Sequence, residues 1–320
     1  MKRINLLFGA LMLLLICACE KDEIAIDPHQ AGDAEEYQVA MEQDYRNQLF
    51  FDLETGEVVC SNLKTEWDLG FECASEGFHV VMNTSKGMAV HHSSMGFSEI
   101  VSATGLDWTW DAHSGNLDST AIGNWTTNNE RYIIDRGYDH TGTHQGYYKI
   151  NLVSVNEAEY KVEYGEITTT EPLTIIIPKS QKHNFRYFSF EDGVGAIAPE
   201  KDKWDLVFTQ YTHLFTDPIS PYVVSGVLLN RYKTFAGVIN DIPFTSVTFE
   251  DAEQLNLSTA INTVGYDWKW YDYDEGVYKV DPTIVYIIQT SEGYYYKLHF
   301  VDFYNETGEK GFPKFECQRL

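Results

Sequence analysis

The chain has 320 residues, 43% of them hydrophobic, which is enough to build two domains with real cores, and its formal net charge is −25 at pH 7. This acidity argues against nucleic acid as a partner, because binding to phosphate depends on Lys and Arg. Aromatic residues make up 14% of the chain, with 21 Tyr, a composition typical of strands rather than helices.

The N-terminal residues have the pattern of a bacterial lipoprotein signal peptide. Two basic residues precede an apolar run over residues 6–16, which is too short to span a bilayer. The run ends in "ICAC", where a small residue stands directly before Cys19, as lipidation of that cysteine requires. The alternative is an ordinary secretory signal with incidental cysteines. We expect a signal peptide over residues 1–18 and an acidic tether over residues 19–35, with Cys19 carrying the lipid.

Most of the remaining apolar stretches alternate with polar residues at a period of two. Examples are "YYKINLVSV" (147–155), "IVYIIQT" (284–290) and "YYYKLHFVDFY" (294–304). They are rich in β-branched and aromatic residues and are bounded by Gly, Asn and Asp, which indicates strands joined by turns. The pattern predicts an all-β fold with little helix, and only residues 34–49 and 251–256 are compatible with helices.

Several landmarks occur twice in the same order, which indicates an internal duplication. The pairs are "LFFDLETGEVV" (49–59) with "YFSFEDGVGAI" (187–197), "EWDLGFEC" (66–73) with "KWDLVFTQ" (203–210), "RYIIDRG" (131–137) with "VYIIQTSEG" (285–293), "GYYKINLV" (146–153) with "YYYKLHFV" (294–301), and "GLDWTWDAHSG" (105–115) with "GYDWKWYDYDEG" (265–276). We therefore expect two related β-rich units packed in tandem, residues 36–171 and 172–320. Trp67 and Trp204 should occupy equivalent buried positions.

The sequence contains no constellation of residues that indicates catalysis. It has no nucleophile elbow, Walker loop or HExxH motif, so we expect a protein that is not an enzyme. His140 and His144 have the i, i+4 spacing of metal ligands on a helix, but the Thr and Gly between them favour a loop. Cys60, Cys73 and Cys317 are odd in number, so disulfides are not expected to be the framework of the fold. A single disulfide between Cys60 and Cys73 remains an alternative.

The second unit resembles the HmuY family, haem-binding surface lipoproteins of Bacteroidetes. The resemblance rests on "FRYFSFEDG", "KWDLVF" and "GYDWKWYDYDEGVYKV", and most specifically on the terminal "FYNETGEKGFPKFECQRL". It is strong over about residues 185–320 and weaker over about residues 45–165. It implies an all-β fold shaped like a hand that grips haem between loops, and a TonB-dependent outer-membrane receptor as partner. The acidic "EKDE" after Cys19 also resembles the signal that sends lipoproteins of these bacteria to the cell surface.

The resemblance also implies a pair of axial ligands. One family ligand follows the end of a Trp-bearing strand, a position that His113 holds five residues after Trp108. The other lies upstream of a segment similar to "GFSE" (96–99), and the family's spacing falls on Met88. Haem iron accepts His and Met as axial ligands. A Met–His pair would favour ferrous iron, because the thioether is a soft, neutral donor.

Alternatives to Met88 lie close by in the sequence. His91, His92 or Met95 would take its place if the loop is shifted, and Met88 could instead pack in the core. In an alternating strand, one member of the His91–His92 doublet would face outward.

The second unit has few such ligands. By the pairing of the Gly-Asp-Trp segments, Tyr273 takes the place of His113, and this unit contains no Met. Tyr binds ferric haem, so Tyr271 and Tyr273 remain alternatives. We expect haem in the first unit, with the second unit as support.

The leading hypothesis is therefore an outer-membrane lipoprotein, exposed at the cell surface, that binds haem or a close porphyrin and passes it to a receptor. The alternative is a non-catalytic surface lipoprotein of the same fold that has lost haem binding. Its ligand would be a glycan, a peptide or a partner protein that contacts exposed Trp and Tyr side chains.

Overall fold

The computed structural model describes residues 31–320, which form one compact unit. The predicted signal peptide, Cys19 and most of the predicted tether lie outside the described residues. The described chain is nearly all β, as predicted, and its one α-helix is α1 (Phe249–Gln254), close to the helix expected at 251–256. The helix expected at 34–49 is wrong, because this segment contains two strand segments joined by a loop. No helix in this part of the chain is long and apolar enough to cross a membrane.

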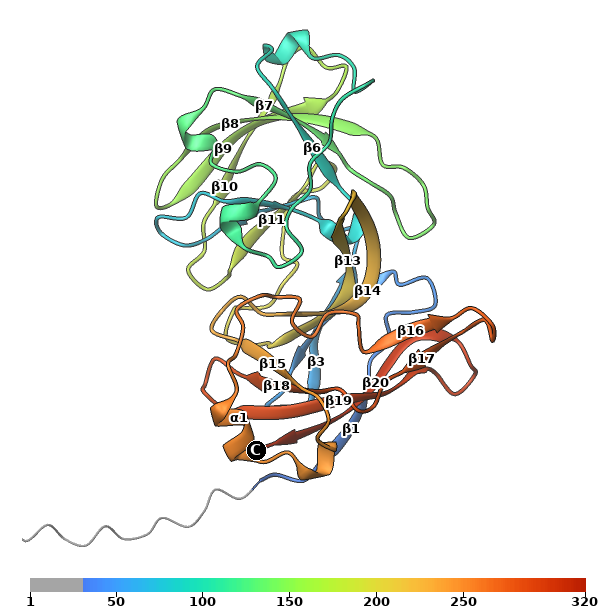
Figure 1. The fold of residues 1–320 in the computed structure, drawn as a ribbon. Helices are drawn as coiled ribbons and strands as arrows, with labels where there is room; N and C mark the ends of the chain where they lie inside the picture. Colours follow the sequence, from blue (N-terminus) through green and yellow to red (C-terminus); the bar gives the residue numbers. More distant parts are fainter. Residues whose placement is uncertain (1–30) are drawn as a thin grey trace, which may run out of the picture. The chain divides into compact units, whose positions relative to one another are not determined.

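The strands form four sheets and a two-stranded ribbon (Figure 1). The first five-stranded sheet has the order β10 (Leu173–Pro178), β9 (Glu159–Glu166), β8 (Tyr147–Val155), β7 (Arg131–Asp135) and β6 (Ala89–Ser93). The second has the order β1 (Glu35–Gln38), β20 (Lys310–Arg319), β19 (Tyr295–Tyr304), β18 (Val285–Gln289) and β15 (Phe235–Ile239). We call these the first and second large sheets.

Two four-stranded sheets join strands from distant parts of the sequence. One has the order β12 (Gly193–Gly195), β11 (Phe185–Ser189), β4 (Leu69–Glu72) and β5 (Val80–Met82). The other has the order β14 (Ile219–Leu229), β13 (Leu206–Thr216), β2 (Asn47–Asp52) and β3 (Glu57–Leu63). The ribbon consists of β16 (Lys269–Asp272) and β17 (Val277–Val280), and single 3-10 turns are η1 (Thr84–Lys86), η2 (Phe97–Glu99), η3 (Leu117–Ser119), η4 (Trp125–Thr127) and η5 (Phe244–Ser246).

The two repeats exchange their first strands. The hairpin β2–β3 of the first repeat pairs with β13 of the second, and the hairpin β11–β12 of the second pairs with β4 of the first. In the same way β1 pairs with β20, and β10 pairs with β9. The units expected in tandem are therefore interlocked through their edges, with each sheet built from both repeats.

The Trp-Asp segments occupy equivalent places, as the sequence predicted, but only one of the two tryptophans is buried as expected. Asn83 donates its side-chain amide to the carbonyls of Trp67 (2.8 Å) and of the residue three before it (2.6 Å). Asn230 does the same around Trp204, at 2.7 Å for both bonds. Trp204 is buried and Trp67 is half-buried, so the two positions are equivalent in hydrogen bonding although they differ in exposure.

The two Gly-Asp-Trp segments are not equivalent. Thr109 of the first segment forms a backbone bridge with Val90 on β6. The matching bridge to β15, the counterpart of β6, comes from Ser258 and not from the residue after Trp268. Local sequence similarity therefore misaligned this part of the repeat by about ten residues, because the pairing to the sheet sets the register.

Tyr273 is consequently no counterpart of His113. Trp268 is fully buried and stacks on Phe300 with ring centroids 3.8 Å apart. The chain then forms the ribbon β16–β17, for which the first repeat has no equivalent among its described strands. Tyr273 lies in the turn of this ribbon and is 89% exposed.

Each large sheet covers its own hydrophobic core. The core of the first includes Leu69, Tyr132 and Ile150, together with Phe188 from the exchanged hairpin. The core of the second is larger and likewise includes Phe51 from the other exchanged hairpin. Cys60, Cys73 and Cys317 are all free, so the Cys60–Cys73 bridge is not formed.

Candidate functional site

A groove of about 570 Å³ lies beside the first large sheet. Its walls include the aromatic side chains of Trp108, Trp110 and Tyr138 from the first repeat. Pro221 and Val223, from β14 of the second repeat, close the other side. A volume of several hundred Å³ with apolar and aromatic walls is typical of small-molecule sites.

The alternation along β6 decides which side chains reach this groove. Val90 packs in the core of the first large sheet, whereas Ala89 lines the groove. Because successive side chains of a strand point to opposite faces, His91 lies on the same face of β6 as Ala89, and His92 lies on the core face. The ring of His92 is accordingly 5.0 Å from that of Tyr132, a core residue. His91 itself is not among the residues that line the groove, whereas its ring neighbour Trp108 is.

His91 has one ring nitrogen engaged and one free. Its Nδ1 lies 2.9 Å from the carbonyl oxygen of Asp107, and only a protonated Nδ1 can make this hydrogen bond. The lone pair therefore stays on Nε2, which is the arrangement of a metal-binding histidine. Trp108 packs edge-on to the His91 ring at 6.5 Å and stacks on Tyr147 at 5.9 Å.

A histidine from the loop after β7 lines the groove directly. The Asp139 carboxylate accepts hydrogen bonds from the backbone of Thr141 (2.8 Å) and Thr143 (2.9 Å), which makes this segment a turn, as the sequence predicted. His140 lines the groove, and its Nδ1 is buried without a hydrogen-bond partner. His144 differs, because its Nε2 contacts Asp135 at 2.8 Å and its Nδ1 accepts from a backbone amide.

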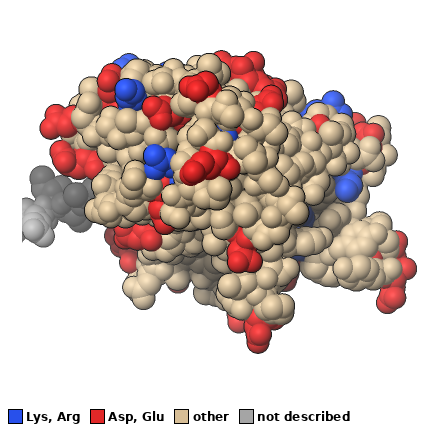
Figure 2. Space-filling model, turned by 90° about the horizontal axis from the view of Figure 1, so that it is seen from above, with Lys and Arg blue, Asp and Glu red and all other residues tan. Residues whose placement is uncertain are grey.

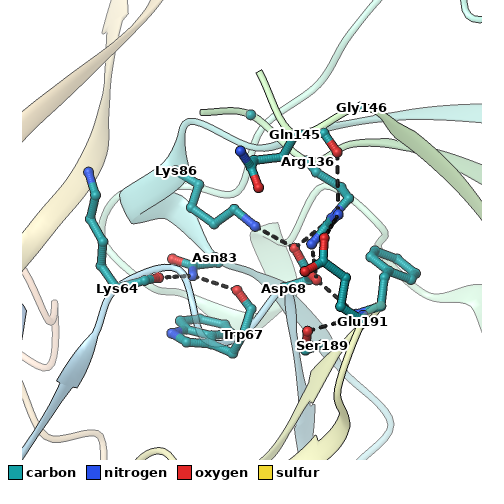
Figure 3. A network of polar contacts seen from close by, with 12 residues as sticks. Lys64, Trp67, Asp68, Asn83, Lys86, Arg136, Gln145, Gly146, Ser189 and Glu191 are labelled. Atoms are coloured by element: carbon teal, nitrogen blue, oxygen red, sulfur yellow. Dashed lines mark hydrogen bonds and ion pairs between the residues drawn. The ribbon is translucent and has the colours of Figure 1, made fainter. Parts of the chain in front are cut away.

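A buried ionic network fixes the two segments that carry these groups (Figure 3). The Asp68 carboxylate accepts from Lys86 and from Arg136, whose Nε lies 3.1 Å away. Asp68 and Lys86 are fully buried, and Glu191 binds the remaining face of the guanidinium at 2.9 Å. Lys86 stands in the wall of the groove, and Arg136 begins the loop that bears His140. The network thus ties Lys86 in the groove wall to the start of the loop that bears His140.

Lys64 is a cation in the groove wall without a direct ion pair, although Asp44 and Asp139 of the same groove act on it at longer range. Its side chain is buried and its ammonium group donates to the Gln210 amide oxygen and to the Ser85 carbonyl. Among residues 31–320 no carboxylate forms an ion pair with it. Burial lowers the pKa of Lys64 to about 8. A negatively charged group in the groove would stabilise this ammonium.

The remaining residues expected to bind iron are engaged elsewhere. Met88 is 1% exposed and packs in the core of the first large sheet. Both ring nitrogens of His92 are used, Nδ1 by Glu130 at 2.9 Å and Nε2 by the Ala121 carbonyl at 2.7 Å. For either side chain to reach iron, these contacts would have to open.

His113 faces the second repeat. Its ring stacks on His213 of β13 with centroids 4.3 Å apart, and its Nδ1 accepts a hydrogen bond from the Leu214 amide at 3.3 Å. Burial, together with His213, lowers the pKa of His113 and favours the neutral ring. None of the four predicted ligands lines the groove itself, and only His91 lies on the face of β6 that borders it.

Sequence reasoning missed the roles of Lys64, Trp110 and His140 in lining the groove. The available signal was the stretch at 138–144, which the second repeat lacks. No group of three or more His, Cys, Asp or Glu side chains in the described chain is arranged to hold a bare metal ion.

Three solved structures are similar to this chain at low identity. They are apo PinO from Porphyromonas gingivitis (9% identity, TM-score 0.30, 90% of this chain and 97% of that one), an apo HmuY analogue from Tannerella forsythia (12%, 0.27, 92% and 99%) and a putative HmuY-like haem-binding protein from Bacteroides vulgatus (12%, 0.23, 89% and 90%). No curated protein sequence matches the chain.

The family comparison is more decisive. The model described as HmuY protein matches twice, over residues 44–172 and 181–317, so that it covers most of the chain. The two matches coincide with the two repeats, which agrees with a duplicated form. The protein belongs to the HmuY family.

Proposed function

We propose that this protein binds haem in the groove beside the first large sheet, with His91 as an axial ligand. The observation that carries the proposal is the hydrogen bond from His91 Nδ1 to the Asp107 carbonyl. It fixes the ring and leaves the Nε2 lone pair for iron.

His140 is the second ligand in this proposal. Its Nδ1 is buried without a partner in the groove wall, and coordination to iron would satisfy it. Two imidazoles from separate segments, β6 and the loop after β7, would give six-coordinate iron. The Met–His pair expected from the sequence would need Met88 to leave the core. We therefore propose a pair of histidines, which would prefer ferrous iron less strongly than a Met–His pair.

The groove also suits the rest of the haem molecule. Trp108, Trp110 and Tyr138 offer flat apolar surfaces for the porphyrin ring. Lys64 offers a buried positive charge for a propionate. Such a charge is needed in a chain of net charge −25, which otherwise repels anions.

The cellular role follows from the N-terminal sequence and the family. We propose that Cys19 is lipidated, that the protein sits in the outer membrane facing outward, and that it passes haem to a TonB-dependent receptor without catalysing a reaction. Figure 2 shows one face of the molecule, with acidic side chains scattered over it and fewer basic ones. This distribution supports a role that does not involve nucleic acid.

One observation favours the alternative, a binding protein for a glycan, peptide or partner protein. The ribbon β16–β17 exposes Trp270 (49%) and Tyr273 (89%), which is a surface for stacking rather than a haem pocket. Absence of haem binding would leave this ribbon as the candidate site.

A haemin titration of residues 31–320 tests the proposal. The wild type should give a sharpened Soret band and six-coordinate spectra. His91→Ala should weaken binding at least about tenfold, or about 1.4 kcal/mol, and abolish the six-coordinate form. His183→Ala is the matched control, because His183 contacts Ser180, does not line the groove and does not belong to β6.

Two outcomes would overturn the proposal. Wild-type spectra identical to free haemin, in both ferric and ferrous states, would rule out haem binding. Unchanged spectra in His91→Ala together with loss of binding in a Tyr271→Phe, Tyr273→Phe variant would move the site to the second repeat.

A further inference from the structure

A second, smaller cavity lies where the exchanged strands of the two repeats meet. Its volume is about 120 Å³, and it is lined by residues of both repeats. The equivalent Trp67 and Trp204 both line it, each packed edge-on against a ring of an exchanged hairpin, Tyr187 for Trp67 (4.8 Å) and Phe50 for Trp204 (4.9 Å). Neither His91 nor His140 lines this cavity, whereas His113, the axial ligand expected from the sequence, does.

Four polar groups of residues that line the cavity are buried without a hydrogen-bond partner in the protein. They are the indole Nε1–H groups of Trp67 and Trp204 and the hydroxyls of Thr209 and Tyr211. Trp204 is 8% exposed and Thr209 5% exposed. A buried donor without an acceptor destabilises the fold, so four unsatisfied groups around one cavity point to a ligand that supplies acceptors.

A guanidinium adds charge to the same cavity. Arg231 donates to the Gly115 carbonyl and makes no ion pair with any described carboxylate. Asp111 also lines the cavity, but its two oxygens already accept from the backbone amides of Met82 (2.7 Å) and Ala121 (2.8 Å). The cavity therefore holds one cation and one carboxylate that act on each other. Because backbone amides already use both oxygens of Asp111, several donors of the cavity remain free for an added acceptor.

The remaining walls are mostly apolar. Phe50, Val81, Leu229 and Ile261 contribute hydrocarbon surface. An apolar cavity of roughly 150 Å³ in a protein core accepts a benzene molecule, so about 120 Å³ suits a single ring or a short branched chain.

We propose that this cavity binds a small monocarboxylate with an apolar body of about one ring. The carboxylate would accept hydrogen bonds from Arg231 and from the indole groups, and the ring would pack between the two tryptophans. The site is independent of haem, and it is built only when both repeats are folded together.

Benzoate is the probe, with residues 31–320 as the protein. Binding is followed by calorimetry and by the indole N–H signals, of which the seven tryptophans give seven. Benzoate should shift the Trp67 and Trp204 signals and raise the melting temperature. Benzyl alcohol, which lacks the charge, should bind at least about tenfold more weakly.

Variants of the lining residues distinguish a specific binding site from a cavity that holds only water. Arg231→Gln should weaken benzoate binding at least about tenfold, and Trp67→Phe, which keeps the ring but removes the donor, should weaken it several-fold. Trp270→Phe on the exposed ribbon is the matched control and should change nothing. The proposal is overturned if benzoate shifts neither indole signal in the wild type, or if it binds Trp67→Phe and Arg231→Gln as tightly as the wild type.

Discussion

Asp68 and Asp205 are the same residue of the repeated Trp-Asp segment in two different electrostatic surroundings. Each donates its backbone N–H to the exchanged hairpin, at the Phe188 carbonyl and the Phe51 carbonyl respectively. Asp68 is neutralised by two cations, whereas Asp205 accepts only the Leu53 amide at 3.0 Å. The two repeats thus share the backbone hydrogen bond of the Trp-Asp segment but differ in the charged groups around its carboxylate.

The loss of Asp68 should therefore destabilise the fold far more than the loss of Asp205. Asp68→Asn leaves the ammonium of Lys86 buried without its carboxylate, which costs about 3–5 kcal/mol of unfolding free energy. Asp205→Asn keeps an oxygen for the Leu53 amide and should cost less than about 1 kcal/mol at neutral pH. Urea unfolding of both variants measures this, and equal losses would contradict the assignment.

The same pair predicts how stability depends on pH. Burial raises the pKa of Asp205 to about 7, aided by the nearby Asp52, although the Leu53 amide opposes the shift. The folded state therefore binds this proton more tightly than the unfolded state, so the free energy of unfolding falls as pH rises from about 4 to about 7 and is flat above. Asp205→Asn should lack this contribution.

The comparison of wild type with the Asn variant isolates the effect from other titrating groups. The variant should become more stable relative to the wild type as pH rises between about 4 and about 7. A difference that stays constant over this range would show that Asp205 has an ordinary pKa.

At the scale of the element, the strand pattern was predictable and the loops were not. On β6 the alternation alone places His91 and His92 on opposite faces, because a strand has a period of two. The pattern could not say which face meets solvent, since Met88 and Val90 reveal the core only once the sheet is assembled.

The misplaced Gly-Asp-Trp pairing has a related cause. In loops, a short motif such as Gly-Asp-Trp recurs without a ladder of hydrogen bonds to fix its position. Thr109 is aligned by its bridge to Val90, and this contact between residues 19 apart is invisible in the sequence. The groove was missed for the same reason, since Lys64 and His140 come from distant segments.

At the scale of the whole molecule, the exchange of hairpins makes the two repeats one folding unit. The first repeat alone would leave β4 and β9 without the partners β11 and β10. It would also expose Leu49 and Phe51, which are buried in the core of the second large sheet. The sequence showed the duplication through its landmarks, but strand exchange depends on pairing across repeats and leaves no periodic signal.

Separated repeats should therefore not fold alone. A fragment of residues 31–171 should lack a cooperative unfolding transition or associate through its open edges, while co-expression with residues 172–320 should restore a one-to-one complex. Circular dichroism and size-exclusion chromatography check this. A monomeric fragment 31–171 with a cooperative transition would contradict the interlocked fold.

The most direct test of the account is a crystal structure of residues 31–320 with haemin. We expect iron bonded to His91 Nε2 at the groove beside the first large sheet, with the Nδ1 hydrogen bond to the Asp107 carbonyl kept. Iron held by Met88 and His113, or haem stacked on the ribbon β16–β17, would contradict it.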